Sequence, residues 1–271
     1  VLLSKIGLKN YDIDIHIAGD LLNQIVSTNY TAAKLEIPLI GIYAACSTST
    51  LGLLLASCLI SSNQVKNAVV STSSHNCCSE KQFRQPVEYG GPKKKSATFT
   101  TTGAASAFLS SKKSKIKITS ATLGTVVDYD QKDPLNMGAA MAPAAAKTIF
   151  AHLKNTNTKV KDYDLILTGD LGKYGFNILK DFMKTEYEIE FDNLADSACM
   201  IYDLKNKDVY AGGSGPSCIA LVAYSYIIEK MKKGKLKKVL MVATGALMSQ
   251  TIVNEKQSIP SISHAVCLEA L

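Results

Sequence analysis

The chain has 271 residues, of which 46% are apolar and 20% are charged. Such a chain can bury a sizeable core, as one large domain or two fused halves, and its composition excludes a disordered, collagen-like or coiled-coil protein. The longest apolar stretch, residues 51–60, is too short to span a bilayer. The chain begins at Val1 without a signal-peptide pattern, and we expect an N-terminal segment of the fold to be missing.

The net charge of +7 comes almost entirely from lysine, since Arg84 is the single arginine. Lysines are densest at residues 93–95, 112–113 and 232–238. They indicate either a solvated surface or attraction to an anionic ligand or membrane surface. Aromatic and arginine side chains do not alternate with these lysines as they do in nucleic-acid grooves, so we do not expect a nucleic-acid partner.

Seven cysteines form no CxxC pair and no repeated spacing, which argues against a disulfide framework and against a zinc site. We expect no bound metal, and we expect most of the thiols to be small buried apolar groups in a reducing compartment. The cysteines are Cys46, Cys58, Cys77, Cys78, Cys199, Cys218 and Cys267.

The sequence repeats itself weakly, in three pairs of segments that follow one another in the same order. In the first pair, each segment is a short apolar run that ends in Gly-Asp-Leu, as expected of a buried strand followed by a helix. In the second pair, each segment precedes an apolar helical stretch. The pairs are residues 14–21 with 164–171, 43–47 with 210–214, and 66–71 with 237–242.

Each copy therefore has the order strand, helix, strand, helix, strand, which predicts parallel strands covered by helices on both faces. We place the first half at residues 1–127 and the second at 128–271. Near this boundary we expect strands within residues 96–109 and 115–127. A loop then leads into a helix over residues 133–146, with Pro143 in the first turn.

Cys46 lies where a parallel α/β fold places its ligand crevice, between the predicted strand 37–43 and a helix that opens at Ser47. Backbone N–H groups and the helix dipole at such a point stabilise a thiolate or another anion. The alternative is another buried structural cysteine.

The run GIYAACSTST around Cys46 resembles the nucleophile turn of thiolase-fold condensing enzymes, and is most similar to ketoacyl-ACP synthase III. The resemblance implies a thiolase-like α/β fold, with duplicated βαβαβ halves in a layered α-β-α-β-α architecture. In that family a histidine and an asparagine from the second half assist the cysteine. This chain has Thr-Gly-Asp170 and Gly-Gly-Ser214 at the matching places. Because losing an oxyanion donor alone costs about 10²–10³ in rate, we do not expect efficient condensation.

Further motifs resemble the stage V sporulation protein AD family of endospore-forming bacteria. The resemblance implies binding of dipicolinic acid, possible entry of calcium with it, and uptake into the developing spore without another cofactor. It also implies a peripheral place at the forespore or spore inner membrane, beside other stage V sporulation proteins, while the thiolase fold implies a homodimer. The motifs include AGDLLNQI, SSHN, EKQFRQPVEYGG, DPLNMGAAMAPAA, AGGSGPSC and IPSISHAV.

A dipicolinate pocket needs cationic or N–H donors for two carboxylates and a slot for the ring. We expect Arg84 to hold one carboxylate, with Lys81 close to it, and the helix start at Cys46 and Ser47 to receive the other. Tyr89 is a candidate pocket wall. A plain surface position remains the alternative for Arg84.

Other candidate ligand-binding residues follow predicted strands. His75 and Asn76 come after the strand that contains residues 68–71, and His264 comes after a strand-like segment near the C-terminus. Ser214 lies in the second-half turn. Asp170 would repel a bare dicarboxylate, so it fits a structural acceptor or a calcium ligand better. A structural position is the alternative for each histidine.

Two other functions stay open. The first is an active acyltransferase or ketoacyl-synthase-type condensing enzyme that uses Cys46 as nucleophile and His75 or His264 as a substitute base. The second is a scaffold with a vestigial pocket that docks membrane channel subunits.

Overall fold

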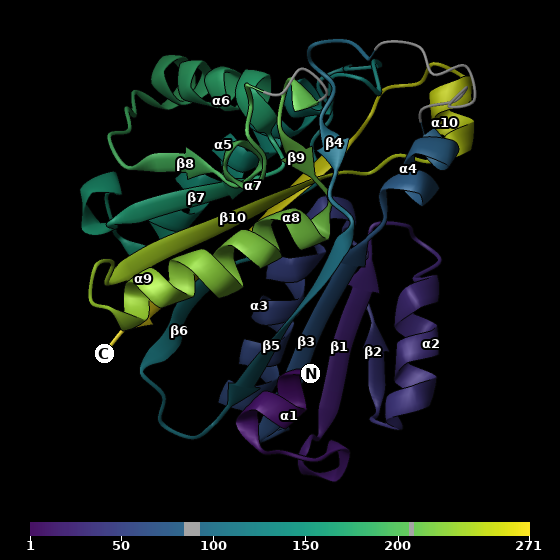
Figure 1. Ribbon diagram of the computed structural model, residues 1–271. Helices are drawn as coiled ribbons and strands as arrows, with labels where there is room; N and C mark the ends of the chain where they lie inside the picture. The colour runs from purple at the N-terminus through teal and green to yellow at the C-terminus, as the bar shows by residue number, and fades with distance from the viewer. Residues whose placement is uncertain (84–92, 206–208) are drawn as a thin grey trace.

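The protein, seen here in a computed structural model, contains two large mixed sheets that lie on either side of a pair of central helices (Figure 1). The structure describes residues 1–83, 93–205 and 209–271. The first sheet has the order β2-β1-β3-β5, and the second has the order β6-β11-β10-β7-β8. The strands of the first sheet are β1 (Ile15–Asp20), β2 (Leu39–Gly41), β3 (Asn67–Ser74) and β5 (Gly103–Ser110).

In the first sheet β1 runs parallel to both β2 and β3, whereas β5 is antiparallel to β3. In the second sheet β10 and β8 run parallel to β7, whereas β11 is antiparallel to both β10 and β6. The strands of the second sheet are β6 (Ile116–Thr122), β7 (Leu165–Gly169), β8 (Leu194–Asp196), β10 (Lys238–Ala246) and β11 (Ser261–Ala270). A short parallel pair, β4 (Phe99–Thr100) with β9 (Gly213–Ser214), joins the two halves.

Helices form three layers around these sheets. The central layer contains α3 (Thr48–Ser61) and α8 (Pro216–Leu221), and α8 continues through a π-helical segment (Val222–Ile227) into α9 (Ile228–Lys232). The outer helices on the first sheet are α1 (Leu2–Ile6) and α2 (Val26–Leu35), and those on the second are α5 (Met137–Thr156) and α6 (Gly172–Tyr187). The other helices within the described residues are η1 (Asn10–Asp12), η2 (Ala45–Ser47), α4 (Asn76–Phe83), η4 (Val160–Asp162), α7 (Ala198–Ile201) and α10 (Gln250–Asn254).

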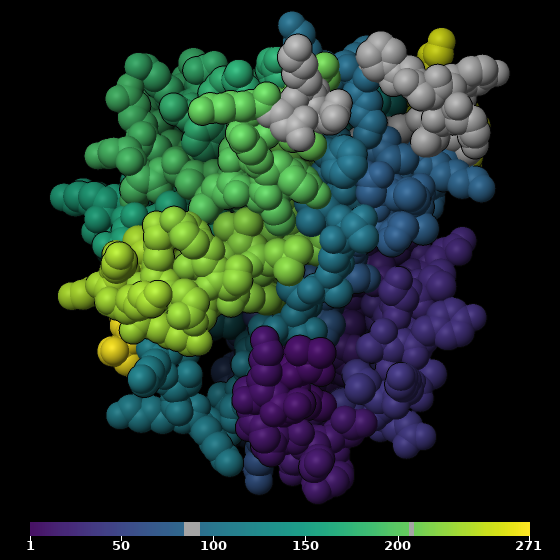
Figure 2. Space-filling model, in the orientation of Figure 1, coloured from purple at the N-terminus to yellow at the C-terminus, as the bar shows by residue number. Residues whose placement is uncertain are grey.

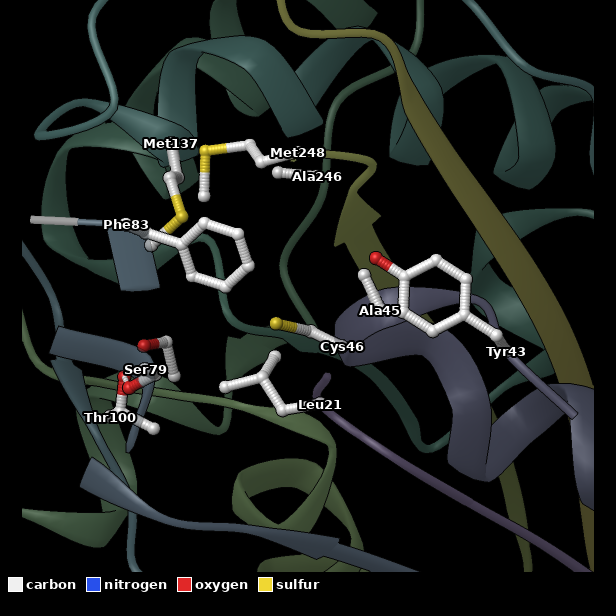
Figure 3. A pocket seen from close by; sticks show the side chains of 11 residues that line it. Leu21, Tyr43, Ala45, Cys46, Ser79, Phe83, Thr100, Met137, Ala246 and Met248 are labelled. Carbon is white, nitrogen blue, oxygen red and sulfur yellow. Dashed lines mark hydrogen bonds between the residues drawn. The ribbon is translucent and has the colours of Figure 1, made fainter. Parts of the chain in front are cut away.

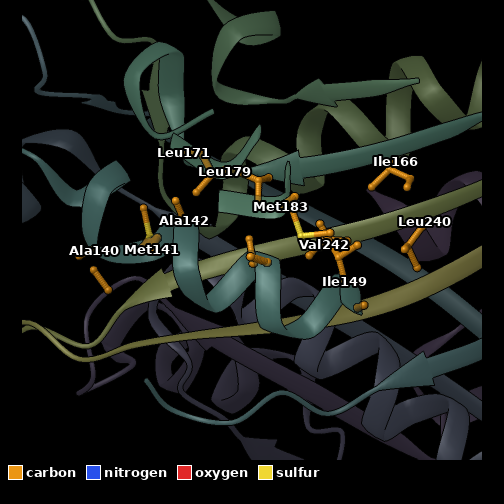
Figure 4. Packing of buried hydrophobic residues seen from close by; sticks show 14 of the residues in the cluster. Ala140, Met141, Ala142, Ile149, Ile166, Leu171, Leu179, Met183, Leu240 and Val242 are labelled. Atoms are coloured by element: carbon orange, nitrogen blue, oxygen red, sulfur yellow. The ribbon is translucent and has the colours of Figure 1, made fainter. Parts of the chain in front are cut away.

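The central strand β10 is buried on both faces, because its side chains alternate between two cores. On β10, Leu240 and Val242 pack with α5 and α6 in one core, shown in Figure 4. The intervening Val239 and Met241 pack with α3 and α8 in the other. This period of two explains why the strand sequence is a continuous apolar run, and the strands covered by helices on both faces, which that pattern predicted, are confirmed.

The duplication extends to the caps that precede the first strand of each half. The Lys9 N–H donates to Asp12 at 2.7 Å, and the Lys159 N–H donates to Asp162 at the same distance. Just after these, Asp14 accepts two backbone N–H groups from the start of β3, and Asp164 accepts two from the start of β10. The two halves therefore begin with the same local structure.

Two local predictions are wrong. Pro143 lies in the interior of α5, because that helix begins at Met137 rather than close to the proline. His264 lies inside β11 rather than after a strand, since the strand continues from Ser261 to Ala270. In addition, β6 pairs with β11 and so belongs to the second sheet, although it precedes the boundary proposed at residue 127. That boundary itself stays a prediction.

Candidate functional site

A pocket opens at the carboxyl ends of the parallel strands, around the thiol of Cys46 (Figure 3). The space in and in front of it that no protein atom occupies is about 390 Å³, open solvent at the mouth included. The thiol points toward the ring of Phe83, which lies on the opposite wall. The described side chains that line the pocket come from both halves and are Leu21, Tyr43, Ala45, Cys46, Ser79, Phe83, Thr100, Met137, Ser214, Ala246 and Met248.

Cys46 sits in a strained turn between β2 and α3. Its neighbour Ala45 has a φ of 48°, a left-handed conformation that is costly for a residue with a Cβ atom. The turn packs directly on the end of β10, where a Cβ at Gly245 would lie 2.3 Å from the Ala44 carbonyl oxygen. Gly245 is therefore required for the close approach that holds Cys46 at the pocket.

Two hydroxyl groups stabilise this turn from within. Ser47 Oγ donates to the Ala44 carbonyl at 2.7 Å, and Thr48 Oγ1 donates to the Ala45 carbonyl at 2.7 Å. Both side chains are completely buried. Ser47, predicted as a carboxylate ligand, is thus absent from the described pocket lining, and its hydroxyl bonds to the turn instead.

Tyr43 forms the wall beside the cysteine turn. Burial raises the pKa of its phenol to about 12, and the charge of a neighbouring Cys46 thiolate adds to this shift. The phenol is therefore neutral at physiological pH, and it can donate a hydrogen bond as well as accept one.

The wall opposite carries hydroxyl groups. Ser79 on α4 donates to Thr100 Oγ1 at 2.8 Å, and Thr100 is paired in register with Ser214 across β4 and β9. This short strand pair brings the second half to the pocket. Ser214, a predicted site residue, accordingly lines it.

Other predicted site residues are not among the described lining residues. His75 is exposed at the start of α4, and Lys81 is exposed on the same helix. Asn76 donates its side-chain N–H to the Thr100 carbonyl at 3.2 Å. His264 is buried in β11 and accepts the Gly124 N–H at 3.1 Å, and burial lowers its pKa to about 4. Arg84 and Tyr89 lie outside the described residues.

Asp170 is completely buried and does not line the described part of the pocket. Within the described residues neither of its oxygens has a hydrogen bond of normal geometry, although the Gly215 N–H and the Cys218 thiol face it. Burial, followed by the charge of nearby Asp196, raises the pKa of Asp170 well above its usual range. The environment of this carboxyl group therefore favours its protonated, neutral form.

Sequence reasoning missed most of the apolar lining. Phe83, Met137 and Met248 come from three elements that meet only in the folded protein. Leu21 could have been found, because it ends the repeated Gly-Asp-Leu motif at the carboxyl end of β1.

Replacing Cys46 by alanine should leave the fold intact. Cys46 is 3% exposed and loses only a sulfur atom, so we expect the free energy of unfolding to fall by about 1 kcal/mol. Urea denaturation of both proteins measures the change. A loss of several kcal/mol would show that the thiol is a structural element of the turn rather than a group presented to the pocket.

Comparisons with known proteins decide the family. The profile of stage V sporulation protein AD (SpoVAD) matches residues 1–269. The chain is also 47% identical, over 269 residues, to stage V sporulation protein AD of Bacillus subtilis strain 168, covering 99% of this chain and 79% of that protein. The chain belongs to the SpoVAD family. It is thus a sporulation protein, as its motifs predicted.

Solved structures show which fold this SpoVAD family member shares. The 3-oxoacyl-ACP synthase III of Aquifex aeolicus VF5 matches with a TM-score of 0.64 at 16% identity, covering 98% of this chain and 80% of that one. The 3-oxoacyl-ACP synthase III of Pseudomonas aeruginosa matches with a TM-score of 0.61 at 10% identity, covering 99% and 79%. At such identities the likeness establishes the thiolase-type fold alone.

The side chains that line the described part of the pocket carry no formal charge. Its polar groups there are a thiol, a phenol and three hydroxyls, while imidazole, carboxamide and charged groups do not occur among the described lining residues. A thiolate nucleophile requires a proton acceptor and oxyanion donors beside it. The described lining offers no imidazole or carboxylate for the first of these roles.

Among the described residues, no three His, Cys, Asp or Glu side chains gather as a metal site. Within the same residues, no helix combines the length and apolar character needed to cross a bilayer.

Proposed function

We propose that this SpoVAD family member binds dipicolinic acid in the Cys46 pocket and takes part in its uptake into the developing spore. The observation that carries the proposal is the pocket itself. The nucleophile-turn cysteine of a condensing-enzyme fold opens there onto apolar walls and hydroxyls, without a base among the described lining residues.

The lining supports a planar aromatic ligand in two ways. Phe83 and the two methionines Met137 and Met248 form an apolar wall, against which a pyridine ring can pack. The Thr100 and Ser214 hydroxyls also line the pocket, and carboxylate oxygens can accept from them, whereas the Ser79 hydroxyl already donates to Thr100. We further propose that Arg84, which follows Phe83 in the sequence, supplies the cation for one carboxylate.

Filling the pocket tests this proposal. Ala246→Leu adds three carbon atoms to the lining, so we expect dipicolinate affinity to fall at least about ten-fold, while the matched change Ala33→Leu on exposed α2 leaves it unaltered. Isothermal titration calorimetry measures both, and a thermal melt verifies that each variant is folded. Saturable binding that is equally tight in both variants would place the ligand elsewhere.

The enzyme alternative predicts a different product. A condensing enzyme or acyltransferase would form a thioester on Cys46 during incubation with acyl-CoA, and intact-protein mass spectrometry detects the added acyl mass. We expect no adduct in the wild-type protein. An adduct that Cys46→Ala abolishes would establish acyl transfer instead.

We also propose that the protein is a peripheral component of the spore inner membrane, beside other stage V sporulation proteins, and that calcium can enter with the ligand. A homodimer is supported by the edge strand β2, whose three residues are all exposed and leave an open row of backbone hydrogen-bonding groups. Sedimentation velocity measures the oligomeric state, and calorimetry with and without calcium measures its contribution.

A further inference from the structure

Lysines gather at the end of the molecule that lies opposite the pocket. Six exposed lysines occupy the chain segments that enter or leave the sheets there: Lys66, Lys112, Lys113, Lys115, Lys235 and Lys237. We call this set the lysine rim. In Figure 1 its segments lie at the lower left, whereas α4, β4 and α10, near the pocket, lie at the upper right.

Backbone hydrogen bonds show that these segments are neighbours in space. The Ser111 N–H, one residue before Lys112, donates to the Lys66 carbonyl at 2.9 Å. The Lys115 carbonyl accepts the Leu271 N–H, and the Lys237 carbonyl accepts the Ala270 N–H. The rim is therefore one continuous band, and Figure 2 shows two of its parts, the β5–β6 link and the α9–β10 turn, protruding on one face.

The charge of this band is only partly offset by its surroundings. No rim lysine lies within ion-pair distance of a carboxylate on the residues that the structure describes. Asp14 and Asp164 lie beside the rim, where each accepts two backbone N–H groups, and the charge of Lys66 also helps to lower the pKa of the Asp14 carboxyl. Glu269 lies on β11 opposite Lys238, outside the rim.

We infer that the lysine rim docks this protein on the surface of a bilayer that contains anionic phospholipids. Exposed lysines attract such a surface over about one Debye length, and they need no fixed geometry to do so. The pocket opens at the opposite end of the strands, so docking leaves it accessible. This inference rests on the proposed place at a membrane, but not on the proposed ligand.

Nucleic acid fits the rim less well. The chain's single arginine, Arg84, is absent from the rim, and the rim segments at residues 111–115 and 233–237 contain no aromatic residue. Grooves for single-stranded nucleic acid rely on both residue types for stacking, whereas headgroup attraction requires only charge.

Vesicle sedimentation tests the docking. We expect the purified protein to bind vesicles of phosphatidylcholine with 30% phosphatidylglycerol (about a physiological fraction of anionic lipid), to lose binding near 0.5 M salt, and not to bind phosphatidylcholine alone. Absence of binding to the anionic vesicles, or equal binding to neutral ones, would overturn the inference. Tighter binding to a single-stranded oligonucleotide than to the vesicles would likewise overturn it.

A matched pair of variants locates the contact. Replacing Lys112, Lys113, Lys115 and Lys235 by glutamine should weaken vesicle binding by about 600-fold, since each lysine near such a surface strengthens binding about five-fold. The control replaces four other exposed lysines, Lys147, Lys173, Lys180 and Lys256, and removes the same charge. An equal loss in both would mean that net charge, and not the rim, drives binding. Dipicolinate titration of the rim variant is independent of this outcome, so the two proposals can fail separately.

Discussion

Gly245→Ala is expected to destabilise the protein by about 3 kcal/mol and to displace the turn that carries Cys46. The added Cβ would lie 2.3 Å from the Ala44 carbonyl oxygen and 3.2 Å from the Cys46 nitrogen. These are backbone atoms of a turn whose residue Ala45 is already strained, so they cannot move aside as the tip of a flexible side chain would. Urea denaturation measures the stability, and the rate of Cys46 alkylation, read by peptide mass spectrometry, measures the displacement.

Gly234→Ala is the matched control. Gly234 has a φ of +69°, and no described atom lies within 4 Å of the position of an added Cβ. We therefore expect a cost of about 1 kcal/mol from the left-handed backbone alone, with an unchanged alkylation rate at Cys46. Equal effects of the two substitutions would refute the contact between β10 and the cysteine turn as the reason for Gly245.

The repeated pattern made most of the fold predictable. Asp14 and Asp164 occupy matching places in the sequence, and in the structure each accepts two backbone N–H groups from the next strand of its half. Apolar runs indicated the buried strands because both faces of each sheet are covered. The cysteine turn was equally visible, since small residues and hydroxyls cluster there before an apolar helix.

The pocket chemistry was less predictable, for two physical reasons. A hydroxyl such as Ser47 can bond either to a ligand or to its own turn, and only the backbone geometry decides between them. A histidine such as His264 can follow a strand or lie within it, and here neighbouring strands bury it on β11. The methionine and phenylalanine walls depend on the packing of distant elements, which local sequence does not determine.

The duplication also exposes one difference between the halves, at the aspartate of the Gly-Asp-Leu motif. In the first half Asp20 accepts the Thr28 N–H at 3.0 Å, and hydroxyl groups of Thr28 and Ser73 also donate to it. In the second half neither oxygen of Asp170 has a hydrogen bond of normal geometry among the described residues, and the carboxyl lies near the buried Asp196. Asp196 itself accepts hydrogen bonds from Thr168 and two backbone N–H groups, and burial still raises its pKa to about 6.

Asp170→Asn is therefore expected to stabilise the protein at high pH. Both carboxyl groups have pKa values above the ordinary 3.8 in the folded state, so the folded protein retains protons that the unfolded chain releases. Below about pH 4 such a group is protonated in both states and contributes its full stabilisation. As the pH rises above this value, the free energy of unfolding falls by about 1.4 kcal/mol per pH unit, until the pH exceeds the pKa of the group in the folded state. The amide cannot ionise, so the variant should lose less stability than the wild type between pH 5 and pH 8.

Urea denaturation at pH 5, 6, 7 and 8 measures how the free energy of unfolding changes with pH in the wild type and in Asp170→Asn. Asp20→Asn serves as the control from the other half. Because the Asp20 carboxylate accepts from three donors, turning one oxygen into an N–H donor should lower the free energy of unfolding by about 1–3 kcal/mol. If the free energy of unfolding depended on pH equally in Asp170→Asn and in the wild type, the Asp170 carboxyl would be ionised in the folded protein. A charge would then lie buried close to Ser214, and the pocket would hold a dianion such as dipicolinate less easily than its neutral lining suggests.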